Sequence, residues 1–160
     1  MLDATMLDIT TLIVNERLPH DQDRAINDEV CLDHAQREKR RFRVVSSKGK
    51  NVDVFLERAN MLAIGDRLIT QCGQCISIVG AKEPVITAST SDWQQFSRVC
   101  YHLGNRHVKL QVGDCWLRIT PDHVLEALID RLGLEVKREQ AVFNPEAGAY
   151  HQQGTNGKHR

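Results

Sequence analysis

No run of apolar residues in this sequence is long enough to cross a membrane. The longest apolar stretches are only a few residues, as in Ile-Ser-Ile-Val at 76–79, whereas a spanning helix needs about 18 or more. The first five residues, Met-Leu-Asp-Ala-Thr, lack the basic start and apolar block of a signal peptide. The 160 residues are 41% hydrophobic and 26% charged, which is typical of a globular protein. We therefore expect a soluble, cytoplasmic protein with no membrane partner.

An excess of charge of either sign is also missing, since 21 basic residues balance 21 acidic ones. This balance argues against a general nucleic-acid-binding protein, so we expect no nucleic-acid partner. The charges are nevertheless uneven: residues 1–35 hold eight acids and two Arg, and residues 36–67 hold nine basic groups and four acids. One basic cluster could contact phosphate or an acidic partner, although such a cluster is more often the solvated face of a strand. It comprises Arg37, Lys39, Arg40, Arg41 and Arg43.

Motifs of covalent catalysis are absent as well. The sequence contains no G-x-S-x-G segment, no glycine-rich phosphate loop and no identifiable Cys-His-Asn order. We therefore predict that the protein is not an enzyme.

The five cysteines, an odd number, indicate reduced thiols and not a disulfide framework. Cys72 and Cys75 have C-x-x-C spacing, which can serve thiol chemistry or half of a zinc site. A structural zinc needs two more ligands, and the sequence has no second C-x-x-C and no H-x₃-H. The pair also lies between two strand-like segments, which favours two thiols in a β-turn.

The first half of the chain has the pattern of a small all-β domain. Segments 41–45 and 52–56 are alternating or β-branched, and the turn-forming residues 46–51 between them predict a hairpin. Further short strands are expected at 12–14, 30–32, 68–70 and 76–79. Strands at this spacing suggest a small barrel or a two-sheet module.

The second half alternates strands and helices. A strand at 85–88 is followed by a helix. Ser91 and Gln94 can form a capping box at its start, and Gly104 ends it. One face of this helix is apolar and is expected to be buried; it consists of Trp93, Phe96, Val99, Cys100 and Leu103. Strands at 107–112 and 115–119 follow. Thr120 as N-cap and Pro121 as first residue then begin a helix that Gly133 closes. A last strand within 134–143 completes the order βαββαβ, the ferredoxin-like arrangement.

These patterns together predict an α+β protein. We expect a β-rich domain at 1–75, a ferredoxin-like domain at 76–146 and a flexible tail at 147–160, which has almost nothing to bury. Because a single core of about 70 residues is marginal, a homodimer is plausible.

Local sequence assigns no certain role to the histidines of the second half, and each has a structural explanation beside any functional one. His107 lies in an exposed kind of position between a helix and a strand, where a lone His is more often structural. His102 faces away from the apolar stripe of its helix. His123 lies near a helix N-terminus, whose dipole favours the neutral, metal-binding imidazole but also merely tolerates an exposed His.

Several segments resemble the UreE family of urease accessory proteins. The strongest is Tyr-His-Leu-Gly-Asn-Arg-His-Val-Lys-Leu-Gln at 101–111. Asp-His-Val-Leu-Glu at 122–126 and Phe-Asn-Pro-Glu-Ala-Gly-Ala-Tyr at 143–150 match in order and spacing, as do 41–43 and 62–68. The similarity covers nearly the whole chain.

This resemblance implies a homodimeric nickel metallochaperone. The β domain would bind partner proteins, namely the GTPase UreG and the apo-urease complex, and the ferredoxin-like domain would dimerise. The family's central metal ligand corresponds to His107, and a peripheral ligand of some relatives corresponds to His123. Another His of some members is replaced by Pro121, and of the family's His-rich tail only His151 and His159 are present.

The chemistry of a single central His is consistent with this role. In a two-fold dimer one His107 per chain becomes two imidazoles at the axis. Imidazole suits Ni(II), and Cu(II) or Zn(II) can bind the same site. His151 or water would complete the coordination. The alternative is an assembly adaptor of the urease accessory complex with vestigial metal binding, and a thiol enzyme using Cys72 and Cys75 is a remote third.

Overall fold

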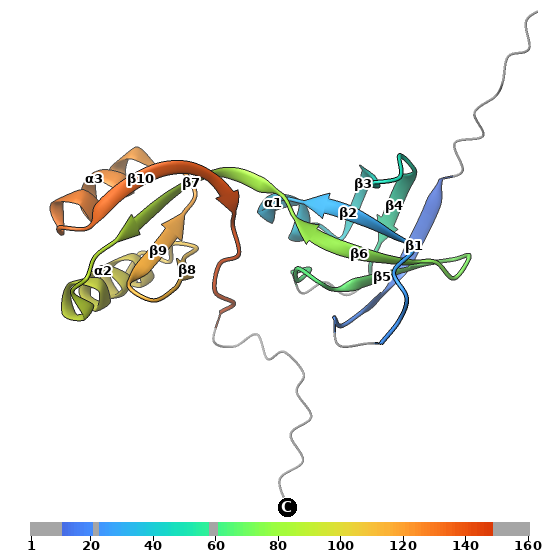
Figure 1. Ribbon diagram of the computed structural model, residues 1–160, viewed down its shortest axis with the longest axis horizontal. Coiled ribbons are helices and arrows are strands. Elements are labelled where there is room, and N and C mark those ends of the chain that lie inside the picture. Colours follow the sequence, from blue (N-terminus) through green and yellow to red (C-terminus); the bar gives the residue numbers. More distant parts are fainter. Residues whose placement is uncertain (1–10, 21–22, 58–60, 149–160) are drawn as a thin grey trace, which may run out of the picture. The chain divides into compact units, whose positions relative to one another are not determined.

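A computed structural model of the protein describes residues 11–20, 23–57 and 61–148, which form two compact units (Figure 1). The first unit ends at Ala81 and the second begins at Lys82. The structure thus moves the boundary predicted between residues 75 and 76. Strand β6 (Cys75–Gly80) belongs to the first sheet, because it pairs with β2 (Asp28–Leu32) and with β5 (Arg67–Thr70). Most of the predicted tail, from residue 149 on, lies outside the described residues.

The N-terminal unit is one six-stranded mixed sheet with the order β2-β6-β5-β1-β4-β3. Its other strands are β1 (Leu12–Leu18), β3 (Arg41–Val45) and β4 (Asn51–Phe55). The predicted hairpin is confirmed, since β3 and β4 pair antiparallel with Arg41 opposite Phe55. Buried residues from all strands form one core, among them Val14, Val30, Val52, Leu68 and Ile78.

The turn after β3 contacts the opposite edge strand of this sheet. The N–H of Ser47 donates to the carbonyl of Glu29 in β2 at 2.8 Å, and the N–H of Lys48 donates to the Asp28 carboxylate at 3.2 Å. The sheet therefore curls upon itself, in keeping with the predicted barrel-like module and not with two separate sheets.

A four-residue helix, α1 (His34–Arg37), interrupts the strands and corrects one prediction. Asp33 and Gln36 form a capping box at its start. The helix is too short to show an apolar repeat, so the sequence pattern does not predict it. Arg37, assigned to the solvated basic cluster, is only 1% exposed, and its Nε donates to the carbonyl of Asp33 at 3.4 Å. It is therefore a structural residue.

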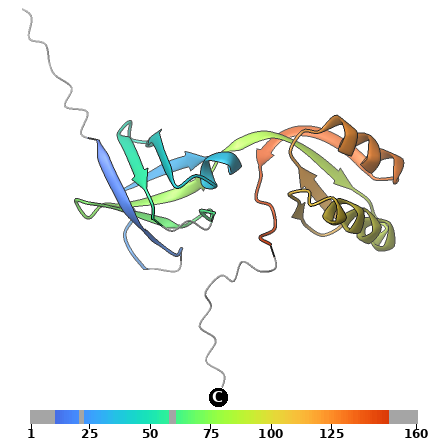
Figure 2. The same ribbon diagram turned by 180° about the vertical axis from the view of Figure 1, so that it is seen from behind.

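The C-terminal unit has the predicted order of elements. It consists of β7 (Lys82–Ser89), α2 (Trp93–Asn105), β8 (Gln111–Val112), β9 (Trp116–Ile119), α3 (His123–Arg131) and β10 (Glu135–Val142), in a sheet of order β10-β7-β9-β8 (Figure 2). One face of the sheet, including Ile86, Leu117 and Ile119, packs with Phe96, Val99, Leu103 and Ile129 of the helices.

The helices begin later than the sequence predicts. Asp92 replaces Ser91 as the cap of α2, and Asp122 replaces Thr120 as the cap of α3. In each case one carboxylate oxygen accepts two backbone N–H groups, which a hydroxyl further back along the chain does not reach. Trp93 is 60% exposed and not buried, because it occupies the first turn at the margin of the apolar stripe.

The two helices of the C-terminal unit run in opposite directions. Each follows one of two neighbouring antiparallel strands, β7 and β9, and returns over the sheet. The side-chain amide of Gln95, near the start of α2, donates to the carbonyl of Leu132, just after α3, at 3.1 Å. The end of α2 and the start of α3 therefore lie at the same end of this unit. No helix among the described residues is long and apolar enough to span a membrane.

Candidate metal centre

His107 occupies an unusual backbone position immediately after α2. Its φ is +56°, in the left-handed region that L-residues other than Gly, Asn, Asp and His seldom adopt. Its N–H donates to the carbonyl of Gly104 at 3.0 Å, and the N–H of Val108 donates to the carbonyl of Leu103 at 3.2 Å. This pair of bonds is a Schellman motif, in which the left-handed residue is usually Gly.

The end of α3 shows the usual version of the same motif. Gly133 has φ +95° and donates to Asp130, and Leu134 donates to the carbonyl of Ile129. His107 thus stands where the equivalent turn of the same unit has Gly. A left-handed L-residue costs about 1–2 kcal/mol, and Cys115 of the same unit, at φ +55°, shares this conformation. His107 combines the conformation with an exposed imidazole, which makes it a candidate for ligand binding.

The surroundings of His107 differ from the prediction in one respect. The sequence places it at the start of a strand over 107–112, but β8 contains only Gln111 and Val112. Residue 107 instead belongs to the turn that closes α2, and its side chain is exposed. Exposure agrees with the prediction.

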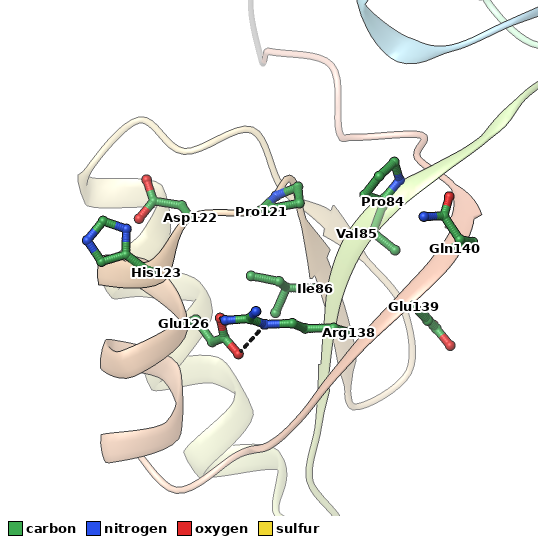
Figure 3. Close-up of a pocket in the computed structure, with 10 residues that line it drawn as sticks. All are labelled: Pro84, Val85, Ile86, Pro121, Asp122, His123, Glu126, Arg138, Glu139 and Gln140. Carbon is green, nitrogen blue, oxygen red and sulfur yellow. Dashed lines mark hydrogen bonds and ion pairs between the residues drawn. The ribbon is translucent and has the colours of Figure 1, made fainter.

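His123 is the first residue of α3 and is also exposed. It lines a groove of about 670 Å³ between the start of α3 and strands β7 and β10 (Figure 3). In Figure 3 its imidazole points away from Arg138, whose guanidinium binds both carboxylate oxygens of Glu126 at 2.6–3.1 Å. That bond holds the pKa of Glu126 below its usual value, and the charge of His123 acts in the same direction.

The segment after β10 is fixed next to the segment after His107. Phe143 is fully buried, and the N–H of Asn144 donates to the Gln111 side chain at 3.0 Å. The N–H of Glu146 donates to the carbonyl of Leu110 at 2.8 Å. The two strongest sequence signatures, at 101–111 and 143–150, are therefore held together by one backbone–backbone bond and one bond to the Gln111 side chain.

The antiparallel arrangement gathers the candidate residues at one end of the unit. The end of α2 carries His107, and the start of α3 carries His123. Strand β10 is antiparallel to β7 and ends opposite its first residue, Lys82, so the chain leaves towards His151 at this same end. His151 and His159 themselves lie outside the described residues.

One copy of the chain does not assemble a ligand set from its described residues. No group of three or more His, Cys, Asp or Glu side chains in 11–20, 23–57 and 61–148 is placed to hold a metal ion. Any site on His107 therefore needs donors from elsewhere, such as a second copy or the residues after 148.

The Cys72–Cys75 segment is the predicted turn. It joins β5 to β6, with Gly73 at φ +84° and its N–H bonded to the carbonyl of Thr70. Cys75 is buried in β6 and Cys72 is exposed. A hydrogen bond with the Thr70 hydroxyl, at 3.1 Å from Sγ, lowers the pKa of the Cys72 thiol.

Sequence reasoning missed three features of this region. These are the left-handed backbone of His107, the bond from Glu146 to Leu110, and the cap Asp122 beside His123. A local signal existed only for the last, since Asp is a preferred cap, whereas the other two depend on tertiary contacts.

Fold and candidate site thus define a two-domain α+β protein with exposed imidazoles at one end of its C-terminal domain. Its N-terminal half, residues 9–81, matches the UreE urease accessory protein N-terminal domain, and residues 83–160 match the UreE C-terminal domain. The chain belongs to the UreE family of urease accessory proteins.

Individual relatives support this over most of both chains. A urease accessory protein UreE of Psychromonas ingrahamii is 50% identical over 139 residues, which are 87% of this chain and 91% of the relative. The UreE of a Marinomonas strain is 51% identical over 121 residues, 76% and 82% of the two chains. That of Marinobacter nauticus is 39% identical over 158 residues, 92% and 87% of the two.

Proposed function

We propose that the protein is a cytoplasmic nickel metallochaperone that binds Ni(II) as a homodimer and delivers it for assembly of the urease metallocentre. The observation that carries this proposal is the exposed His107 in the left-handed position that closes α2, a position that Gly133 occupies at the end of α3. An exposed imidazole in this turn is accessible to a metal ion, and imidazole nitrogen is a ligand that suits Ni(II).

A two-fold dimer would supply the donors that one copy lacks. With His107 near the axis, the same surface of each copy faces itself and two imidazoles meet. The exposed aromatic side chain of Tyr101, 67% exposed in the last half of α2, supports such an interface. The C-terminal unit, whose element and sheet order are those of a ferredoxin-like domain, would thus dimerise.

The anchored segment 143–146 would bring a third donor within reach. From Glu146 to His151 is five residues, which span at most about 18 Å, and from Leu110 back to His107 is three, at most about 11 Å. His151 of either copy can therefore approach the axis. His123, at the same end, would bind more weakly, because Pro121 leaves it without a neighbouring donor.

An open site of this kind suits a carrier. Two or three imidazoles leave positions for water, so the ion can be passed on to a partner. Affinity alone would not select nickel, since Cu(II) binds imidazole more tightly and Zn(II) also binds it. Selectivity would come from metal availability and from the receiving proteins, the GTPase UreG and apo-urease.

Calorimetric nickel titration of the dimer and four variants tests the proposal, with mass checked by light scattering. We expect His107→Ala to abolish the tight site, removal of residues 151–160 to weaken it, and His123→Ala to have least effect. His102→Ala, an exposed His within α2, is the matched control. The proposal fails if the dimer binds no nickel at micromolar concentration, or if truncation abolishes binding while His107→Ala retains it.

An assembly adaptor with vestigial metal binding is the second candidate. It is favoured by the absence of a three-donor group among the described residues and by Pro121 beside His123. A His107→Ala variant that fully supports urease activation at limiting nickel would decide for the adaptor.

A further inference from the structure

The outer face of strands β1, β4 and β3 presents apolar and basic side chains together. These strands lie side by side at one edge of the N-terminal sheet (Figure 1). Phe42, Val44, Val52 and Val54 point to the core, so the alternate residues point outward. We call these outward residues the β3–β4 face; they are Ile13, Arg41, Arg43, Val45, Asp53 and Phe55.

Cross-strand pairing places Arg41, Arg43, Asp53, Phe55 and Ile13 beside one another, with Val45 at the far end of the face. Arg41 lies opposite Phe55, Arg43 lies opposite Asp53, and Asp53 in turn neighbours Ile13 of β1. Phe55 is 47%, Val45 60% and Ile13 37% exposed. Single exposed apolar residues are ordinary, but three on adjacent strands beside arginines resemble the centre of a protein interface, where aromatic residues and Arg are enriched.

The face carries net positive charge, because Arg41 and Arg43 stand against the single carboxylate of Asp53. Arg43 is held by a two-pronged bond to Asp53, with Nε–Oδ1 at 2.6 Å and Nη2–Oδ2 at 2.8 Å. Arg41 has no hydrogen-bond or ion-pair partner among the described residues. Arg41 lies opposite Phe55, and its guanidinium is available to a carboxylate of a partner. Arg43 is already bound to Asp53.

We propose that the β3–β4 face binds an acidic segment of a protein of the urease maturation machinery. An apolar side chain of that segment would pack on Phe55, and a carboxylate would bind Arg41. This inference rests on the proposed function for its choice of partner. A nucleic acid fits less well, because the carboxylate of Asp53 lies in the middle of the face, where phosphates would have to lie.

Binding of full-length variants to the purified GTPase and to purified apo-urease complex, measured by biolayer interferometry, tests the proposal. Arg41→Glu and Phe55→Ala should each weaken binding to at least one of them by about tenfold or more, as loss of an interface hot spot does. Arg24→Glu and Ile26→Ala, exposed in the loop between β1 and β2, are the matched controls and should change it less than about twofold. Wild-type binding should weaken as salt is raised.

A photocrosslinker placed at Phe55 identifies the segment that is bound. We expect a cross-link to an acidic segment of the partner, and no competition by a short DNA duplex. Unchanged affinity of Arg41→Glu and Phe55→Ala, wild-type binding to neither protein, a cross-link to a basic segment, or displacement by the duplex would each overturn the proposal. Nickel titration of the same samples tests the proposed metallochaperone function separately from the proposed docking face. The β3–β4 variants should bind nickel as the wild type does, whether or not the face is correctly assigned.

Discussion

The backbone N–H of Glu146 donates a hydrogen bond to the carbonyl of Leu110 at 2.8 Å. This bond fixes the point from which the last residues of the chain depart, three residues along the chain from His107. Buried Phe143 and the bond from Asn144 to Gln111 hold the same segment in place. The relationship shows that two motifs far apart in the sequence, at 101–111 and 143–150, are neighbours in the C-terminal unit.

Replacing His107 separates metal binding from helix termination. We expect both His107→Gly and His107→Ala to lose tight nickel binding. His107→Gly should be more stable than His107→Ala by about 1 kcal/mol, because only Gly adopts φ +56° without steric cost. Tryptophan fluorescence during urea unfolding measures this directly, since both Trp residues lie in the C-terminal unit. An Ala variant as stable as the Gly variant would contradict the assigned strain.

The bond between Glu146 and Leu110 predicts a mutant that resembles the truncation. Glu146→Pro removes the donating N–H, so residue 146 is no longer held next to Leu110, and on the proposed function His151 should reach the metal less often. Nickel affinity should fall to the level of the protein lacking residues 151–160. Glu146→Ala keeps the N–H and should bind as the wild type does. The anchoring role is wrong if both substitutions have the same effect in calorimetric titration.

Asp28 makes the N-terminal unit sensitive to acid. Burial raises the pKa of this carboxyl, but the nearby Ser46 hydroxyl and the N–H groups of Glu29 and Lys48 outweigh it, and the net pKa lies below the usual value. A lowered folded-state pKa stabilises the fold at pH values above the unfolded pKa of about 3.9, and this stabilisation is lost as pH falls through the folded pKa.

Asp28→Asn should therefore destabilise the N-terminal unit at pH 7 by about 1–2 kcal/mol, with the difference from wild type shrinking below about pH 4. Circular dichroism during urea unfolding reports the β-rich unit, and tryptophan fluorescence reports the other unit as an internal control. Asp23→Asn, in an exposed loop, should behave as the wild type at every pH. A difference that stays constant down to pH 2.5 would exclude an ionic contribution of Asp28.

The two thiols of the turn should not take part in nickel binding. Cys75 is buried in β6 and Cys72 bonds to Thr70, and no third donor accompanies them among the described residues. Replacing both by Ser should leave the number of nickel ions per dimer unchanged. Because burying a hydroxyl at position 75 has a cost, the N-terminal unit should lose about 1–3 kcal/mol of stability. Loss of one ion per chain would restore the C-x-x-C pair as a metal site.

Local sequence determined most of the secondary structure. The turn residues 46–51 lie in a confirmed hairpin, Gly133 ends α3, and the apolar repeat of α2 predicts the burial of Phe96, Val99 and Leu103. These features depend on contacts within a few residues, so periodicity and turn chemistry suffice to predict them. Errors include element ends, such as the caps Asp92 and Asp122, the boundary that β6 moves to Ala81, and the short helix α1 that buries Arg37.

Tertiary structure alone decided how the candidate site is arranged. The sequence predicts that Gly104 ends the helix, whereas α2 continues to Asn105 and His107 closes it in a Schellman motif, with Leu103 packed in the core. Likewise, His123 and the start of the tail reach the same end as His107 because β7 pairs antiparallel with both β9 and β10. The pairing of strands that are distant in the sequence therefore sets the positions of these residues. The hydrophobic pattern of the sequence predicts which segments form strands, but it does not predict which strands become neighbours.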